Sequence, residues 1–519
     1  MGRKTPLIGL LLLFCLLWLS CANPVMPTGG PADKQPPRLL FTNPDTFATG
    51  VQTGNLLLTF NEWIDLKNGQ REVQISPPQA QPPILTVRGK SVLITLKDSL
   101  LPNTTYQINF GSAIRDITEA NVSKGLSYVF STGPVLDSAW IERRLLDSKT
   151  GRPLAGAVCM AYRNPITAQN AERRPEFLGY ADSSGWVKLN YLPNQDLYLL
   201  GLRESAPDFI YNRPGAEWIG FELNPAKPFD SDTLWLFKEE PDSQAIRSAT
   251  ELHGGKWALK LNLPAQSIEL VDSPEDLSGM LLERDPGMVD SCVLWLPNTG
   301  RMDSLNIALL ADNSLLRRTL YPKGMPKPPK PGKPALEGPT SMPWVLSYSR
   351  PIVQAYPEQF RLTADSVKIP FNLSLNRGRA SIQFDFLPNK TYRLAWDSAA
   401  FIDIFAEKAL PGELKFDAEA DRNFVTWTVL FRSKPNTPRL IWAETKQGLR
   451  LPFNMKPDGL SGSLTLPVGE YLLLHTEDEN SDGRCNPGNW KNKALPEKTY
   501  ISKKPFLLKP GFDVETVWE

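Results

Sequence analysis

The sequence predicts an all-β protein in which β-sandwich domains follow one another in an elongated array. Short runs of alternating apolar and polar residues, the pattern of half-buried strands, recur through nearly all of the chain. Clusters of Gly, Pro, Asn and Asp separate these runs, and the 519 residues include 35 Gly and 48 Pro, which favours many turns. A hydrophobic fraction of 41% supports packed cores. The length allows several domains of about 100–200 residues each.

Residues 1–20 predict a secretory signal peptide. Basic residues stand near its start, an apolar run follows, and Ser20 stands directly before Cys21. The apolar run is shorter than the roughly 20 residues that a transmembrane helix needs. A small residue before a cysteine resembles a bacterial lipobox, which implies cleavage before Cys21 and attachment of lipid to it. Trp18 stands where a lipobox usually has an aliphatic residue, so an ordinary secretory signal is the alternative.

Residues 21–37 predict a tether between the lipid and the first domain. They are rich in Pro and Gly and show no apolar periodicity, which is typical of extended linkers. Ala22 and Asn23 follow the cysteine where an acidic residue would retain a lipoprotein in an inner membrane. By this resemblance to sorted lipoproteins, we expect the protein on the outer membrane, on its periplasmic or cell-surface face. Its lipid anchor would then be its contact with the membrane.

Residues 38–134 alternate like strands and predict the first β-sandwich. The segments 58–62 (Leu-Thr-Phe-Asn-Glu), 101–106 (Leu-Pro-Asn-Thr-Thr-Tyr) and 128–133 (Tyr-Val-Phe-Ser-Thr-Gly) resemble the SbsA-type bacterial Ig-like domain. Together with residues 21–33, they resemble a family of Bacteroidota Ig-like lipoproteins. This resemblance implies a fold and a cell-envelope address more than an activity.

Residues 135–240 predict a second sandwich of a different kind. The pairs 150–151 (Thr-Gly) and 184–185 (Ser-Gly) are hairpin turns in which Gly supplies a positive φ. Alternate residues of the segment 158–162 face one side of a strand. These features resemble the carboxypeptidase regulatory-like, transthyretin-like sandwich.

Residues 241–340 predict a third β-domain with a proline-rich, basic loop at 322–334. Such a loop can dock a protein partner as a polyproline segment, or it can be a solvated insertion between strands. We expect the solvated insertion.

The second half of the chain repeats the first. Leu387-Pro-Asn-Lys-Thr-Tyr echoes Leu101-Pro-Asn-Thr-Thr-Tyr, and the echo extends through the strand and the Ile-rich segment that follow. We therefore expect a second Ig-like domain at residues 341–420. Residues 421–519 resemble a second transthyretin-like domain.

One loop carries residues that suit a cation. In the loop that begins at Asp478, oxygen-bearing side chains stand at the first, third, fifth and ninth positions, and Gly483 stands at the sixth. This spacing can wrap oxygens around Ca²⁺. We expect a structural Ca²⁺ site in which the Arg484 carbonyl is a backbone ligand. The twelfth position of the loop, where a bidentate Glu is usual, holds Asn489. Glu497 would supply the missing carboxylate. An acidic turn without metal is the alternative. The candidate ligands are Asp478, Asn480, Asp482, Arg484, Asn486 and Glu497. The corresponding loop at 203–212 has lost this spacing, and we expect no Ca²⁺ there.

Composition and motifs favour neither catalysis nor nucleic-acid binding. A formal charge of +1 gives the chain no overall attraction to nucleic acid. The sequence contains no hydrolase elbow, zinc-protease or P-loop motif. His253 and His475 are the histidines, and we expect His475 to point outward or to be packed in a strand. Cys159 and Cys292 are expected to be small buried hydrophobic residues.

We therefore expect a non-enzymatic cell-envelope lipoprotein, a scaffold or protein-binding module at the outer membrane. Its partners would be the membrane and other envelope proteins, without nucleic acid. The alternative is a carbohydrate-binding or adhesion lipoprotein, for which exposed aromatic residues gathered on one sandwich face would be the sign. A third hypothesis is a hydrolase within residues 241–340 that uses Asp272, Glu275 and Asp276.

Overall fold

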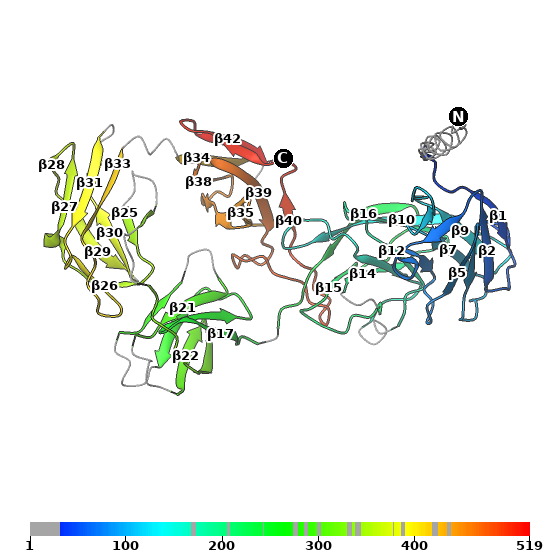
Figure 1. Ribbon diagram of the computed structural model, residues 1–519, viewed down its shortest axis with the longest axis horizontal. Coiled ribbons are helices and arrows are strands. Elements are labelled where there is room, and N and C mark those ends of the chain that lie inside the picture. Colours follow the sequence, from blue (N-terminus) through cyan, green and yellow to red (C-terminus); the bar gives the residue numbers. More distant parts are fainter. Residues whose placement is uncertain are drawn as a thin grey trace, which may run out of the picture. The chain divides into compact units, whose positions relative to one another are not determined.

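The computed structural model describes residues 32–167, 173–204, 208–241, 243–272, 279–284, 289–297, 303–329, 335–337, 344–376, 378–385, 390–417, 424–432 and 437–518. Strands dominate these ranges, whose helical elements are α2 (Gly69–Glu72) and the 3-10 turn η1 (Pro357–Gln359) (Figure 1). The predicted all-β fold class is confirmed. The chain divides into two compact units, Met1–Asp137 and Ser138–Glu519. No helix among the described residues is long and apolar enough to cross a membrane.

The first unit contains a β-sandwich, sandwich 1 (residues 39–131). Its core forms because Leu56, Leu58 and Phe60 alternate toward one side of β2 and are buried there. They pack in one cluster with Tyr106 and Phe130, whose rings stack 5.1 Å apart. The sheets, in strand order, are β1 (Leu39–Asn43)–β2 (Asn55–Phe60)–β6 (Ser91–Thr95)–β5 (Ile84–Arg88), β4 (Gln74–Ser76)–β7 (Thr105–Asn109)–β9 (Ser127–Ser131), and β3 (Ile64–Leu66)–β8 (Ile114–Asp116).

The second unit begins with sandwich 2 (residues 139–237), in which one sheet is buried on both faces. Cys159 and Ala161 of β11 face the core between the sheets, whereas Val158, Met160 and Tyr162 belong to a second cluster on the other face. The predicted alternation and the burial of Cys159 are thus confirmed. The sheets are β13 (Trp186–Leu192)–β10 (Ala139–Asp147)–β16 (Asp230–Leu236) and β12 (Phe177–Tyr180)–β11 (Val158–Tyr162)–β14 (Tyr198–Arg203)–β15 (Trp218–Phe221).

Sandwich 3 (residues 246–320) encloses its own core. Trp257, Leu259 and Leu261 alternate into it from β18, and Cys292 is buried there as predicted. The sheets are β17 (Ile246–His253)–β18 (Lys256–Leu261)–β21 (Ser291–Trp295)–β20 (Leu281–Glu283) and β19 (Ile268–Asp272)–β22 (Leu305–Ala311)–β23 (Ser314–Leu320).

The described part of the proline-rich segment after sandwich 3 is mostly exposed, as expected of a solvated insertion, but two of its carbonyls are held by hydrogen bonds. Pro328 is buried, and its carbonyl accepts hydrogen bonds from the buried guanidinium of Arg350. The N–H of Gly254 donates to the Pro326 carbonyl at 2.9 Å. Prolines cannot donate backbone hydrogen bonds, but their carbonyls can accept them. Residues 322–329 are therefore held at the carbonyls of Pro326 and Pro328. Residues 330–334 lie outside the described residues.

Sandwich 4 (residues 335–417) repeats the strand pairing of sandwich 1. The pair β26–β32 corresponds to β3–β8, and β27–β31–β33 corresponds to β4–β7–β9. Asp116 ends β8 and Asp403 ends β32, and both buried carboxylates accept backbone N–H bonds from the turn that follows. The sequence echo thus has a structural counterpart. The sheets are β24 (Ala335–Glu337)–β25 (Trp344–Ser347)–β30 (Arg379–Gln383)–β29 (Asn372–Asn376), β28 (Val367–Lys368)–β27 (Phe360–Ala364)–β31 (Thr391–Trp396)–β33 (Gly412–Asp417), and β26 (Ile352–Ala355)–β32 (Phe401–Asp403).

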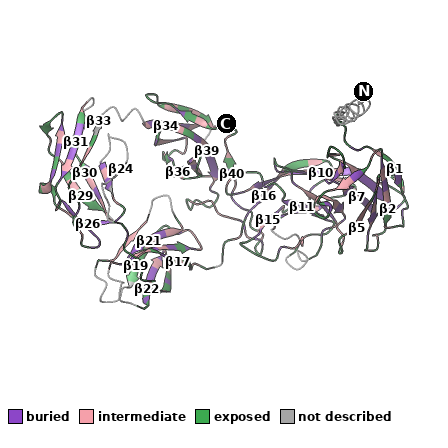
Figure 2. Cartoon of the chain, viewed as in Figure 1, coloured by how far each residue is buried: buried purple, intermediate pink, exposed green. Residues whose placement is uncertain are grey.

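Sandwich 5 (residues 424–518) repeats the pairing of sandwich 2. In both, the first strand pairs in parallel with the last, β10 with β16 and β34 with β42. Buried residues lie along the strands of each sandwich (Figure 2). The sheets are β37 (Asn454–Met455)–β38 (Ser461–Pro467)–β34 (Phe424–Phe431)–β42 (Val514–Trp518) and β36 (Arg450–Pro452)–β35 (Arg439–Thr445)–β39 (Gly469–Glu477)–β40 (Thr499–Ile501), with β41 (Phe506–Leu508) also on β39.

Candidate functional site

The loop between β39 and β40 holds the residues predicted to bind a cation, and its first residue organises the turn. Asp478 is 2% exposed. Its carboxylate accepts hydrogen bonds from the N–H groups of Asp482 at 3.1 Å and Gly483 at 3.0 Å. Gly483 has a φ of 77°, a conformation that costs glycine little. The sharp turn expected at this glycine is therefore present.

Glu497 lies against the same loop, as the sequence suggested, although it stands far along the chain. It is 5% exposed. One carboxylate oxygen accepts from the N–H of Glu479 and the other from the N–H of Asn486, both at 2.8 Å. Burial raises the pKa of Glu497 and outweighs these hydrogen bonds. Glu497 thus connects the two ends of the loop.

The middle of the loop is held by side-chain amides. Asp482 accepts hydrogen bonds from the amide nitrogens of Asn480 at 3.1 Å and Asn486 at 2.7 Å. Burial pushes the pKa of Asp482 upward, but the hydrogen bonds from Asn486, Asn480 and the N–H of Arg484 outweigh it and lower the pKa. The amide oxygen of Asn480 also accepts the N–H of Asp482 at 3.1 Å. Across the described ranges, no group of three or more His, Cys, Asp or Glu side chains is placed to hold a metal.

Arg484 has a role that its sequence position did not reveal. Its guanidinium donates to the Asp312 carboxylate at 3.2 Å and to the Pro264 carbonyl at 3.3 Å, both in sandwich 3. Gln266 of sandwich 3 contacts the Asp482 carbonyl at 3.4 Å. The loop therefore contacts a neighbouring sandwich, which spacing within the loop could not predict.

The segment between β39 and β40 also contacts sandwich 2. Trp490 is buried in the outer cluster of that sandwich, with its ring centroid 5.2 Å from that of Phe221. The backbone N–H of Trp490 donates to the Glu239 carboxylate at 2.7 Å. Lys493 lies over the Trp490 ring, and burial lowers its pKa to about 8. Sandwich 5 thus supplies part of the apolar packing of sandwich 2, and no local sequence signal marks this.

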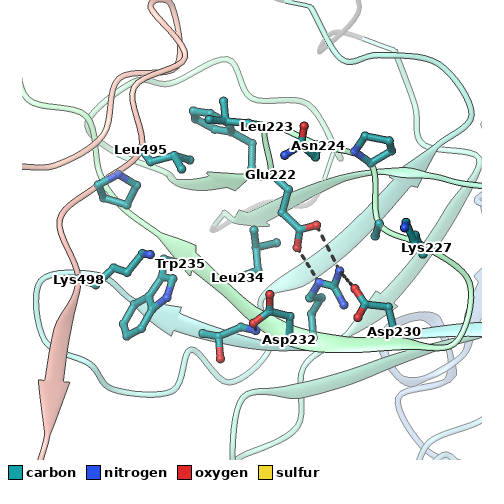
Figure 3. Close-up of a pocket in the computed structure, with 16 residues that line it drawn as sticks. Glu222, Leu223, Asn224, Lys227, Asp230, Asp232, Leu234, Trp235, Leu495 and Lys498 are labelled. Carbon is teal, nitrogen blue, oxygen red and sulfur yellow. Dashed lines mark hydrogen bonds and ion pairs between the residues drawn. The ribbon is translucent and has the colours of Figure 1, made fainter.

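A polar cavity of about 470 Å³ lies next to this contact (Figure 3). One wall comes from Leu495, Pro496 and Lys498, the residues on either side of Glu497. The remaining lining comes from sandwich 2 and includes Trp235 and Asp232. The loop and the cavity therefore share one short segment of chain.

The cavity contains a buried arginine held by two carboxylates (Figure 3). Arg143 donates to both oxygens of Glu222, at 2.6 and 3.2 Å, and to Asp230 at 2.8 Å. Its remaining terminal nitrogen donates to the Glu142 carbonyl at 2.8 Å. Bidentate pairing of this kind fixes geometry strongly. Because all three nitrogens of the Arg143 guanidinium are engaged by acceptors of the protein, the arrangement holds the wall of the cavity together.

A second surface of sandwich 2 gathers aromatic rings and cations. On the sheet β13–β10–β16, away from the core, Trp140 meets the exposed ring of Phe229 with centroids 6.0 Å apart, and Nζ of Lys188 lies 4.2 Å from the centre of the Trp140 ring. Trp186 lies opposite Arg144 on the neighbouring strand. This is the gathering of aromatic residues that we named as the sign of a carbohydrate-binding face.

The loop at 203–212 resembles the 478–497 loop in one respect. Glu217 is buried and accepts hydrogen bonds from the N–H groups of Asn212 at 3.3 Å and Arg213 at 3.1 Å. Burial raises the pKa of Glu204 to about 7. Residues 205–207 lie outside the described residues, and the absence of Ca²⁺ here stays a prediction.

The structure does not describe several residues that the sequence singled out. Cys21 lies outside the described residues, as do Glu275 and Asp276, and the side chain of Asp272 is not described. The lipid anchor and the hydrolase hypothesis therefore stay predictions.

Comparison with known proteins places one part of the chain in a family. Residues 33–132 match the bacterial Ig-like domain. Sandwich 1 therefore matches the bacterial Ig-like domain, as its sequence suggested. The match covers too little of the chain to assign the remaining sandwiches, and no curated protein matches the chain.

The solved structures that match the chain do so at low identity and low TM-score. The Bacillus anthracis TIE protein is 11% identical over 94% of this chain and 76% of its own, with a TM-score of 0.15. The S-layer protein SbsC is 9% identical over 91% and 67%, with a TM-score of 0.15. BcpA, the major pilin subunit of Bacillus cereus, is 9% identical over 74% and 99%, with a TM-score of 0.14. Likenesses of this size carry no argument about function.

Proposed function

We propose that the protein is a non-enzymatic cell-envelope lipoprotein that acts as a scaffold or protein-binding module at the outer membrane. The observation that carries this proposal is the duplicated order of sandwiches, in which sandwiches 4 and 5 repeat the pairing of sandwiches 1 and 2. Repeated domains with separate cores offer large outer surfaces, and in repeat proteins such surfaces commonly bind partners. The predicted leader and lipobox supply the address.

Acyl labelling of the full chain in a bacterial host tests the address. We expect label on the wild type and on a Cys485→Ala control, and none on Cys21→Ala, which should also leave the membrane fraction. Cross-linking in intact envelopes followed by purification tests the scaffold role. Recovery of the same envelope proteins with the wild type, but not with Cys21→Ala, would support it. Labelling of Cys21→Ala would contradict the anchor.

We propose further that the loop at 478–497 binds a structural Ca²⁺. The support is the spacing of the oxygen-bearing side chains and the hydrogen bonds that join Asp478 to Asp482, Asp482 to Asn486, and Asn486 to Glu497. A ligand that binds the folded form alone stabilises it by about 2.7 kcal/mol at a hundredfold excess over Kd. We expect Ca²⁺ to slow hydrogen exchange in peptides from β39 and β40.

A variant pair tests this cation site. Asp478→Ala with Asp482→Ala should abolish the effect of Ca²⁺. Asp458→Ala is the matched control, because Asp458 also caps a backbone N–H in a turn of sandwich 5 but lies outside the loop. An unchanged exchange pattern when EDTA is added to the wild type would return the loop to an acidic turn.

The gathered aromatic residues of sandwich 2 favour a second candidate function, a carbohydrate-binding or adhesion lipoprotein. Aromatic rings offer flat apolar faces, and Lys188 and Arg144 stand beside them as hydrogen-bond donors. Retention of the full chain on immobilised envelope glycans tests it. Trp140→Ala with Trp186→Ala should abolish retention, whereas Trp442→Ala, a tryptophan beside Arg450 in sandwich 5, should retain it. Absence of wild-type retention would contradict this candidate.

A further inference from the structure

Sandwich 1 carries a tryptophan that its fold leaves in solvent. Phe60 and Ile64, on either side of it in sequence, are buried in the core, whereas Trp63 is 62% exposed. Ile117 is 58% exposed, and its N–H donates to the Trp63 carbonyl at 3.3 Å. Because this bond continues the pairing of β3 with β8, the two apolar residues stand opposite each other on neighbouring strands.

The turn between β5 and β6 lies directly beneath the indole. A Cβ added at Gly89 would stand 3.4 Å from the Trp63 ring, so the ring rests on the glycine backbone. Gly89 also has a φ of 63°, which favours glycine. The carbonyl of Gly89 accepts the N–H of Ile64 at 3.1 Å. The tryptophan is therefore supported from below and presents its other face outward.

Two basic residues lie next to Asn61, which stands two residues before Trp63. The ammonium of Lys90 donates to the Asn61 carbonyl at 2.8 Å. The backbone N–H of Arg38 donates to the Asn61 side-chain oxygen at 2.7 Å, and its guanidinium donates to the side chain of Gln35 at 3.0 Å. Glu62 and Glu119 are close in sequence, so the net charge of this end is small. Exposed apolar area, with cations at its margin, is thus the main chemical feature.

The chain enters sandwich 1 at this same end. The side chain of Asn121 donates to the Asp33 carbonyl at 2.9 Å, and the N–H of Asn121 donates to Asp116, the residue before Ile117. The twelve residues from Ala22 to Asp33 can span at most about 40 Å when fully extended. A lipid on Cys21 would therefore keep this end of sandwich 1 close to a bilayer.

We propose that sandwich 1 contacts the lipid bilayer through Trp63 and Ile117, with Lys90 and Arg38 at the phosphate groups. This proposal rests on the lipid anchor of the proposed function. Tryptophan is enriched at the membrane–water interface because its ring is apolar and its N–H is polar. Basic side chains beside an apolar wedge add attraction to anionic headgroups. The contact would hold sandwich 1 at the membrane surface instead of leaving it free on its tether.

Vesicle sedimentation of the full mature chain carrying Cys21→Ala tests the contact without the anchor. The vesicles contain phosphatidylethanolamine with or without phosphatidylglycerol. We expect binding that is too weak to keep the unlipidated chain in a membrane fraction but is measurable with excess vesicles. It should fall about tenfold or more in Trp63→Ser with Ile117→Ser, because two apolar side chains then stay in water. Phe512→Ser is the matched control, since Phe512 is 74% exposed but lies in sandwich 5. Lys90→Gln with Arg38→Gln should weaken binding to anionic vesicles alone.

A photo-crosslinking residue at position 63 of the lipidated chain gives a second readout in membranes. Crosslinks to lipid, absent when the same residue replaces Phe512, support the contact. Crosslinks to a protein, or equal vesicle binding by the double variant and the control, would overturn it. Failure of the anchor itself shows separately, as loss of acyl label from Cys21, and leaves the vesicle result intact.

Discussion

His475 makes sandwich 5 sensitive to acid. The side chain is 6% exposed, and in the described part of the chain neither ring nitrogen has a hydrogen-bond partner. Its ring centroid lies 5.8 Å from those of Phe431, Tyr500 and Trp518. Of the two placements that the sequence left open, the packed one is therefore correct.

The size of the effect follows from the environment of the imidazole. Burial, and secondarily the charge of Arg439, lowers the pKa of His475 from 6.5 to about 4. Arg439 stands opposite Glu477 in the ladder of β35 and β39, and burial lowers its pKa overall, although the charge of Glu477 raises it in part. A difference of about 2.5 between folded and unfolded pKa corresponds to about 3.4 kcal/mol at 1.36 kcal/mol for each pKa unit.

The sign follows from proton linkage. A depressed folded pKa means that the unfolded chain binds the proton more readily. The full stability of sandwich 5 is thus present above pH 6.5, declines as the pH falls from 6.5 to about 4, and levels off below that. Carboxylates elsewhere add their own acid dependence, so the test must isolate His475.

Hydrogen exchange of peptides from β39 and β42, corrected for intrinsic rates, measures local opening at pH 7 and pH 4.5. We expect the opening free energy to fall in the wild type and to fall by about 2–3 kcal/mol less in His475→Phe, which keeps the ring but cannot take a proton. His253→Phe is the control, because it removes the other histidine. Equal acid sensitivity in His475→Phe and the wild type would refute the reasoning.

Three further substitutions test the packing of the second unit. Trp490→Ala should cost about 3–5 kcal/mol because it empties a filled apolar site, and faster exchange in β15 as well as in β39 would show that it contributes to both sandwiches. Arg143→Ala should destabilise sandwich 2 by about 3–5 kcal/mol in denaturant unfolding, because Glu222 and Asp230 lose their partner. The double variant Arg143→Ala with Glu222→Gln should recover part of this loss. Gly185→Ala should lower stability by about 1–3 kcal/mol, since φ is 82° and the new Cβ would stand 2.8 Å from the Leu145 carbonyl oxygen; an unchanged melting temperature would contradict it.

The elements that the sequence predicted correctly are those written in local patterns. Alternation along β2 and β11 and the positive φ of Gly185 follow from neighbouring residues. The hairpin expected at Gly185 is wrong, because the turn joins β12 and β13, which belong to different sheets. The strand pairing of sandwich 4 is predictable because the Leu-Pro-Asn sequence and the strand after it recur; Leu387-Pro-Asn389 itself lies outside the described residues. Even the long-range association of Glu497 with the loop was predictable, because the loop lacked one carboxylate.

The contacts between sandwiches could not be predicted in this way. Trp490 reads as another apolar residue in a polar connection, and nothing near it in sequence identifies Phe221 or Glu239 as its neighbours. Arg484 was assigned to the loop through its carbonyl, yet its side chain binds Asp312. Such contacts depend on how separate domains meet, and that information is distributed over surfaces instead of local periodicity.

Sandwich 2 and sandwich 5 share a strand order but differ at one connection. In each, a buried glutamate, Glu217 or Glu497, accepts backbone N–H bonds from the connection that leaves the third strand of its sheet. Only the later connection, within the described residues, carries a tryptophan into the other copy, where it packs on Phe221. One copy thus offers an apolar face and the other covers it. Sandwich 2 and sandwich 5 therefore share a strand order but differ at the connection that holds the candidate cation site.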